Sequence, residues 1–157
     1  MNKKTIKTLA TGRSIYLIDI ENLVGASEIS EEQVAQVRAD VLSVAAPRPM
    51  DQFYVASSHH NKTAASFGWP SATYGFKSGE DGADFMLIKQ MIEVGNAQNF
   101  DHVYVASGDG GMAWYVNHLA SCGVRVTIVA NHRGFSGEMR SADADVIWLD
   151  DDYALAA

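Results

Sequence analysis

The sequence is short of the residue types that several kinds of protein depend on. Cys122 is its only cysteine, which excludes an internal disulfide and a cysteine-rich zinc site and suits a reducing cytoplasm. No apolar run approaches the roughly 20 residues that span a bilayer, so no membrane contact is expected. Acids outnumber bases by 19 to 12, and the net charge of −7 predicts no general attraction to nucleic acid. Contact with nucleic acid would need a local basic patch or bound cations.

Apolar residues, in contrast, are plentiful enough for one folded domain. The 157 residues are 47% hydrophobic and 20% charged, and they contain no repeat or low-complexity linker. The first residues carry several lysines but no long apolar segment, so residues 1–14 are expected to be a flexible tail rather than a signal peptide. The domain is predicted over residues 15–150, and residues 151–157 are predicted to form a second tail.

The most informative stretch is the sequence IYLIDIEN at residues 15–22. Four bulky apolar residues run without alternation into Asp19, which is typical of a strand buried on both faces of a parallel sheet. A short core helix is the alternative, but the β-branched and aromatic content favours a strand. In open α/β sheets, ligands bind beyond the carboxyl ends of the strands. Asp19 would stand at that edge, either as part of a site or simply as a loop residue or helix cap.

Strand-like and helix-like segments alternate along the rest of the chain. After a loop at 23–29, Ser30 and Gln33 form a capping-box pattern before a helix with valines at helical spacing. Further strands are predicted at 52–57, 72–76, 102–106, 124–130 and 146–149, and further helices at 62–67 (capped by Asn61), 83–94 (stopped at Gly95) and 112–121. This alternation predicts a parallel sheet with right-handed crossovers and helices on both faces.

Three carboxylates follow strand-like segments, and a parallel sheet would bring them to one edge. Asp19 follows the first strand, Asp84 ends the turn after the third, and Asp109 lies in a glycine-rich turn after the fourth. Carboxylates gathered in this way repel one another unless one is protonated or a cation lies among them. Oxygen ligands suit Mg²⁺ or Mn²⁺, which can generate hydroxide or hold the oxygens of a phosphodiester. Asp84 could instead cap its helix, and Asp109 could stabilise its turn.

These motifs together resemble the NYN domain family, which has the PIN-like ribonuclease fold. Residues 19–23 (DIENL) resemble its opening D-x-x-N motif, residues 77–84 its Lys-Gly-x-Asp segment, and residues 107–109 its S-G-D motif. Residues 123–126 and 144–149 resemble its closing strands, so the likeness covers residues 15–149. The resemblance implies an α/β fold, a PIN-like three-layer sandwich whose mostly parallel sheet has the order 3-2-1-4-5.

The same resemblance implies an activity, a cofactor and a set of site residues. The activity would be Mg²⁺- or Mn²⁺-dependent endonucleolytic cleavage of RNA, which we expect to be single-stranded, and a homodimer is left open. The catalytic, metal-binding positions would be Asp19, Asp84 and Asp109. The substrate-binding positions would be Asn22, Lys77 and Ser107.

One position departs from the family pattern. The family usually has a second acid two residues after the acid of S-G-D, and Gly111 stands there in this chain. Glu21 and Asp143 are the candidate replacements. Asp143 would reach the acidic edge if the last strand ran antiparallel to the fifth, since a parallel connection needs about a dozen or more residues. The missing acid also leaves open a degenerate domain that binds RNA or a protein partner without cleaving.

One other enzyme class shares part of this pattern, and several further residues have more than one possible role. A phosphatase of the haloacid-dehalogenase type also uses an aspartate after the first strand, but it needs a second one where Glu21 stands. Phosphate contact and simple solvation are the alternatives for four residues in loops at the same edge, and a metal role is a third alternative for the two histidines: His59, His60, Lys62 and Arg133. Base stacking and core packing are the alternatives for Trp69 and Tyr74, and packing is the default for Trp114 and Tyr115.

Overall fold

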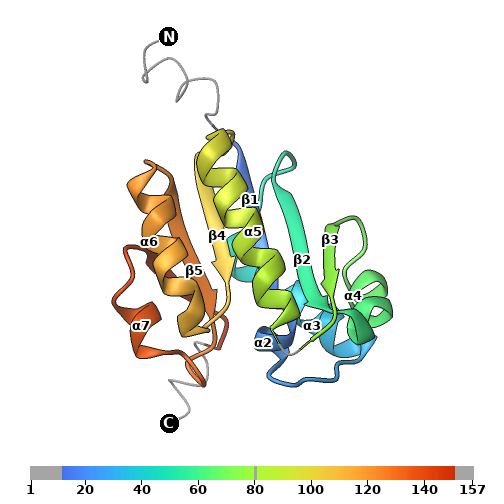
Figure 1. Cartoon of the computed structure of the whole chain (residues 1–157). Helices are drawn as coiled ribbons and strands as arrows, with labels where there is room; N and C mark the ends of the chain where they lie inside the picture. Colours follow the sequence, from blue (N-terminus) through green and yellow to red (C-terminus); the bar gives the residue numbers. More distant parts are fainter. Residues whose placement is uncertain (1–11, 80, 151–157) are drawn as a thin grey trace.

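A six-stranded parallel sheet of order β3-β2-β1-β4-β5-β6 runs through the centre of the structure (Figure 1). The structure is a computed structural model, and it describes residues 12–79 and 81–150. In chain order the elements are β1 (Ser14–Asp19), α2 (Ile20–Val24), α3 (Glu31–Ala45), β2 (Gln52–Ser58), η1 (His59–Asn61), α4 (Lys62–Gly68), β3 (Thr73–Lys77), α5 (Gly82–Ala97), β4 (His102–Ala106), η2 (Gly110–Met112), α6 (Ala113–Ser121), β5 (Arg125–Ala130), α7 (Gly137–Arg140) and β6 (Asp145–Trp148).

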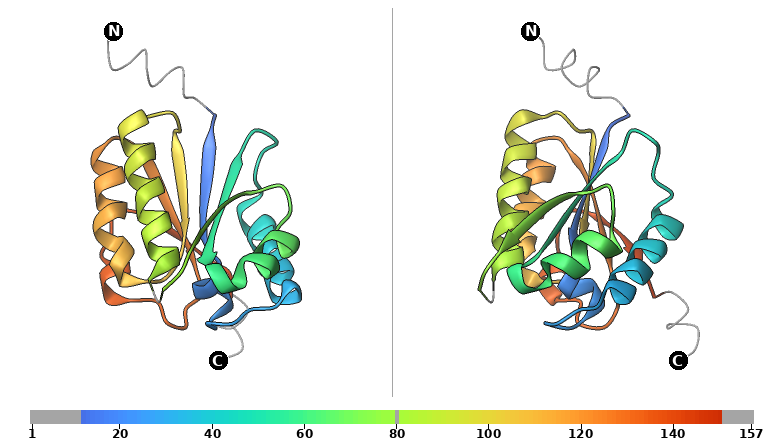
Figure 2. Two further views of the ribbon diagram at one scale, coloured as in Figure 1. Left: turned by 45° about the vertical axis from the view of Figure 1, so that its right-hand side comes forward. Right: turned by 90° about the vertical axis from the view of Figure 1, so that its right-hand side faces the viewer.

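Helices cover both faces of the sheet, which confirms the predicted three-layer arrangement (Figure 2). On one face, Leu87 of α5 and Leu119 of α6 pack in a core with Leu17 of the central strand. On the other face, Val34 of α3 packs in a second core with Ile18. Because both faces are covered, all six residues of β1 are buried, and its side chains show no alternation in hydrophobicity.

The central position of β1 creates the crevice in which a ligand is expected. β1 pairs with β2 on one side and with β4 on the other, so the chain runs outward from β1 in two opposite directions. Ile18 lies opposite Ala106 in the register, which puts Asp19 level with the residue that follows β4. Such a reversal of strand order leaves an opening at the carboxyl edge of the sheet.

Two helices differ from the sequence-based prediction. The segment predicted as a loop from residue 23 is partly the short helix α2, which begins directly after Asp19 and ends at Gly25 with a φ of 82°. Five residues are too few to show helical periodicity in a sequence. Helix α5 does not stop at Gly95 but continues to Ala97, since one glycine costs a helix only about 1 kcal/mol relative to alanine.

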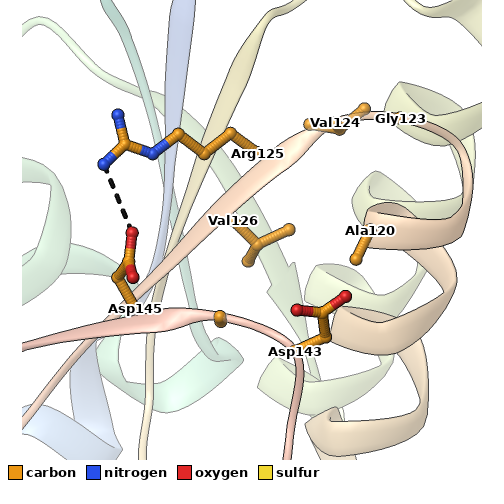
Figure 3. A pocket seen from close by; sticks show the side chains of 8 residues that line it. Ala120, Gly123, Val124, Arg125, Val126, Asp143 and Asp145 are labelled. Atoms are coloured by element: carbon orange, nitrogen blue, oxygen red, sulfur yellow. Dashed lines mark hydrogen bonds and ion pairs between the residues drawn. The ribbon is translucent and has the colours of Figure 1, made fainter.

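The last strand runs parallel to β5, so the antiparallel alternative is wrong. Residues 131–144, which include α7, make a crossover long enough for parallel pairing. Asp145 therefore opens β6 at the amino edge of the sheet, where it forms an ion pair with Arg125 at 3.2 Å (Figure 3). Asp143 lines a pocket of about 430 Å³ at the same place. It lies at the edge opposite Asp19 and does not supply the acid that Gly111 lacks.

Of the helices described, none has the length and apolar character that crossing a bilayer requires. The predicted terminal tails lie outside the described residues apart from residues 12–14, and Ser14 already opens β1.

Close packing of α3 against α4 depends on Gly68. A Cβ atom at this position would lie 2.5 Å from Val34 Cβ and 2.8 Å from the carbonyl oxygen of Glu31. We expect Gly68→Ala to lower the free energy of unfolding by about 1–3 kcal/mol because the two helices must move apart. Urea denaturation measures this change. Gly137→Ala is the control, since no atom lies within 4 Å of its added Cβ, and equal losses in both variants would contradict the packing argument.

Candidate acidic active site

Asp19 ends the central strand with a carboxylate that is almost completely buried. Its side chain is 3% exposed. Oδ1 accepts a hydrogen bond from the backbone N–H of Asn22 at 3.3 Å, which caps α2, and Oδ2 accepts one from the hydroxyl of Ser107 at 3.0 Å. Burial raises the pKa of Asp19 to about 6 against these two hydrogen bonds, and the charges of Asp109 and Glu21 add to the rise. The site thus contains an acid that is costly to ionise.

Two hydrogen bonds join the end of β1 and the first turn of α2 to the turn after β4. The hydroxyl of Ser107 donates to Asp19 and accepts from the backbone N–H of Asp109 at 3.1 Å. The side-chain oxygen of Asn22 accepts from the N–H of Gly108 at 2.9 Å. Ser107 is completely buried, so it positions two acids, and a direct contact with substrate would require this turn to open. Asn22 is exposed beside it.

Asp84 and Asp109 complete the group of acids at this edge. Asp84 lies in the first turn of α5 and is half-buried. Burial is the main reason that its pKa rises to about 7, followed by the charges of Asp19 and Asp109, a hydrogen bond to Asp109 and the charge of Asp81. Asp109 caps η2 by accepting the N–H of Gly111 at 2.9 Å. Asp109 therefore has the structural role in its turn that was expected as an alternative, whereas Asp84 lies in the first turn of α5 without capping it.

The donor chemistry of this group fits a hard divalent cation. Its oxygens are all carboxylate oxygens, and the electrostatic strain among them is of the kind that Mg²⁺ or Mn²⁺ relieves. Within residues 12–79 and 81–150, however, no three acids, histidines or cysteines are already gathered closely enough to hold a metal ion. Both observations agree if the three carboxylates are near enough to repel one another but would have to turn inward to share one ion.

Glu21, the other candidate replacement for the missing acid, is engaged elsewhere. Its Oε1 accepts hydrogen bonds from the N–H and the hydroxyl of Ser58, at 3.1 and 3.0 Å, and its Oε2 accepts one from Asn61. The Asn61 side chain also donates to the carbonyl of Ser27 and accepts from the N–H of Ile29. Asn61 therefore does not cap α4, although the sequence predicted that cap. Glu21 and Asn61 instead fasten α2 to the end of β2.

Cationic residues reach the same edge from two sides. Lys77 ends β3, and a Cβ on Gly82 would lie only 2.0 Å from the Lys77 carbonyl oxygen, so the turn into α5 is tightly closed. Glu80, within this turn, lies outside the described residues. On the other side, Asn22 and Arg133 line a cleft of about 810 Å³. His60 contacts the carbonyl of Ser27 at 2.7 Å.

One further acid lies beside the glycine-rich turn and was not singled out from the sequence. A Cβ on Gly110 would lie 2.8 Å from Oε2 of Glu138 and 2.9 Å from the hydroxyl oxygen of Ser136. The backbone N–H of Ser136 donates to the carbonyl of Gly108 at 3.1 Å. The absence of a side chain at Gly110 thus lets the start of α7 close against η2. These contacts join segments that lie far apart in the sequence, so no local pattern predicted this neighbour.

The topology and the acidic carboxyl edge define a PIN-like α/β protein. The NYN domain family matches residues 14–150, and the chain belongs to this family, which is part of the PIN-like ribonuclease superfamily. A crystal structure of a protein of unknown function from Vibrio parahaemolyticus has the same fold, with a TM-score of 0.56 and 18% identity over 89% of this chain and 94% of that one. No protein of curated function shows detectable similarity. Family membership favours a nuclease-type site over the haloacid-dehalogenase-type phosphatase.

The raised pKa values of Asp19 and Asp84 predict how stability depends on pH. Both acids have an ordinary value of 3.8, and in the fold the values are about 6 and about 7. The folded state therefore binds more protons than the unfolded state between about pH 4 and pH 7, and the free energy of unfolding falls as pH rises through that window. In EDTA, we expect Asp84→Asn to melt at a temperature that falls less between about pH 5 and pH 8 than that of the wild type.

Asp143→Asn is the matched control, because it removes an exposed acid at the other edge of the sheet. If the melting temperatures of Asp84→Asn and the wild type fall by the same amount between about pH 5 and pH 8, the raised pKa of Asp84 is not what makes stability depend on pH.

Proposed function

We propose that the protein is a metal-dependent endoribonuclease that cleaves single-stranded RNA at the carboxyl edge of its sheet. The observation that carries the proposal is that three acids from different elements influence one another at one edge: the charge of Asp109 contributes to the raised pKa of both Asp19 and Asp84, and Asp84 shares a hydrogen bond with Asp109. These three residues would hold Mg²⁺ or Mn²⁺. Such an ion, when bound, supplies positive charge to the phosphate and lowers the pKa of a water molecule. The lone free thiol, Cys122, suits a cytoplasmic location.

The chain's own residues would prepare the site for a phosphate. Ser107 and Asn22 hold the start of α2 and the turn after β4 in a fixed relation, so the backbone that carries Asp19 and Asp109 needs little reorganisation when the side chains turn toward an ion. Asp84 has a pKa of about 7 and would release its proton near neutral pH when a cation arrives. Lys77 and Arg133 would contact phosphates on either side of the cleaved bond.

Gly111 supports a second candidate function, an RNA-binding domain that has lost cleavage. One assay separates the two functions and also tests for a phosphatase. The protein is incubated with labelled single-stranded RNA and with p-nitrophenyl phosphate, each with Mn²⁺ or with EDTA. We expect RNA cleavage in the samples with Mn²⁺ but not in those with EDTA, and no release of p-nitrophenol in either. Binding without cleavage would support the degenerate domain, and phosphate release would contradict both.

The metal-binding part of the proposal predicts a specific change in thermal stability. Mn²⁺ should raise the melting temperature of the wild type, because a ligand present at 100 times its Kd stabilises the folded state by about 2.7 kcal/mol. Asp109→Asn should lose this response. It should fold normally, since the asparagine oxygen can still accept the N–H of Gly111. Asp143→Asn is the control and should respond as the wild type does. A wild-type response in Asp109→Asn would show that Asp109 is not a ligand.

The departure at position 111 gives a prediction for a gain of activity. The backbone of Gly111 lies outside the left-handed region, and a Cβ there would meet only Asp109, at 3.4 Å. An aspartate thus fits without backbone strain and places its carboxylate beside that of Asp109. We expect Gly111→Asp to raise the rate of RNA cleavage about tenfold, which corresponds to about 1.4 kcal/mol of activation energy. The rates are compared at equal folded fraction.

Gly111→Asn is the control for this substitution, since it has the same shape without the charge. A rate that is unchanged in a well-folded Gly111→Asp protein would show that the second acid is not what limits this site. Glu138→Gln, which removes the carboxylate beside Gly110, is the companion variant. If Gly111→Asp restores activity lost in Glu138→Gln, the two acids serve the same role.

A further inference from the structure

Two exposed aromatic side chains stand at the beginnings of the two helices that follow the acidic turns. Trp114, in the first turn of α6, is 66% exposed, and Phe85, in the first turn of α5, is 52% exposed. Core packing was the default expectation for Trp114, and it is wrong. Trp69, in contrast, is buried. Large aromatic rings contribute much of the buried area wherever they lie in an interface.

Helical spacing explains why these rings face solvent. In α6, Val116 and Leu119 are buried against the sheet, and Trp114 lies on the opposite side of the helix. In α5, Leu87 and Met91 occupy the buried side, and Phe85 lies opposite them. The two rings therefore lie on the outer surface of one helical layer.

Both rings lie near the acidic edge of the sheet, because their helices begin there. Helices α5 and α6 lie side by side and run in the same direction, and both begin at the carboxyl edge of the sheet (Figure 1). Phe85 follows Asp84 directly, and Trp114 begins the helix that η2 and its cap Asp109 lead into. A single-stranded nucleic acid with one phosphate bound at the acids could extend along this surface and place its bases over the two rings.

From this arrangement we infer that Trp114 and Phe85 are a base-stacking platform for single-stranded RNA, an inference that rests on the proposed function. Stacking on aromatic rings holds single strands with little regard to sequence. It also suits this chain, because the net charge of −7 leaves little general attraction for phosphates.

Neighbouring side chains hold both rings in place. The Trp114 ring stacks on His118, with centroids 5.4 Å apart and planes at 5°, and meets the edge of Tyr115 at 5.0 Å. The ammonium of Lys77 lies 3.7 Å from the centroid of Phe85. A ring that is already ordered loses little entropy on binding, and Lys77 brings a positive charge for a passing phosphate. A cation beside an exposed aromatic ring matches a nucleotide, which has both a phosphate and a base, better than it matches a second copy of the chain.

The test measures binding by the full-length protein with Ca²⁺ in place of Mn²⁺, and electrophoresis checks that the strand stays intact. Kd values are obtained by fluorescence anisotropy with labelled oligouridylate and with an abasic strand of the same length. We expect Trp114→Ala and Phe85→Ala each to weaken oligouridylate binding about tenfold and to leave abasic-strand binding unchanged. Trp114→Phe keeps a ring and should retain most of the affinity. Phe67→Ala is the matched control, since Phe67 is 68% exposed on α4.

Each other outcome overturns the inference in a recognisable way. Wild-type affinity in Trp114→Ala and Phe85→Ala would mean that the rings do not touch RNA. An equal loss for both strands would mean that the substitutions act on phosphate contacts. A wild-type dimer that Trp114→Ala converts to a monomer, with RNA binding unchanged, would identify the surface as an interface between copies. Failure of the platform leaves Mn²⁺-dependent cleavage intact, whereas failure of the proposed function leaves RNA binding without cleavage.

Discussion

The buried carboxylate of Asp19 is the constraint on which the rest of this site depends. A charge at the end of the central strand is unfavourable unless it is hydrogen-bonded, and here the bonds come from the first turn of α2 and from the turn after β4. Satisfying one acid therefore fixes the two turns that carry Asn22 and Asp109. The hydrogen bonds do not remove the strain, because burial still dominates the pKa. The site is rigid in its backbone and electrostatically unrelieved.

The parallel direction of every strand separates the two edges of the sheet into different chemical environments. At the carboxyl edge, acids from β1, α5 and the turn after β4 are partly or wholly withdrawn from water. At the amino edge, Asp145 is exposed and paired with Arg125, where solvent screens the charges. The same residue type is thus withdrawn from water beside like charges at one edge, and exposed beside a cation at the other. Acid count alone does not locate a site, and the direction of the last strand decides which acids matter.

The sequence predicted the parts of the structure that depend on long or repeated patterns. The order of the first five strands follows from the alternation and the family likeness, and β4 has the bounds that were predicted. The capping box at Ser30 is present because both of its residues are local. The direction of β6, the commitment of Glu21 to Ser58 and Asn61, and the exposure of Trp114 depend on distant neighbours. No periodicity in the sequence records such contacts, so only the three-dimensional structure reveals them.

The relaxed backbone at Gly111 has a consequence for how this protein can change. Glycine and aspartate codons can differ by a single base, and nothing in the local conformation penalises the larger residue. The fold therefore places no barrier between this form of the domain and one with an additional acid. Whether a lineage keeps the glycine is then a matter of selection on the reaction, and members with either residue can share the same architecture.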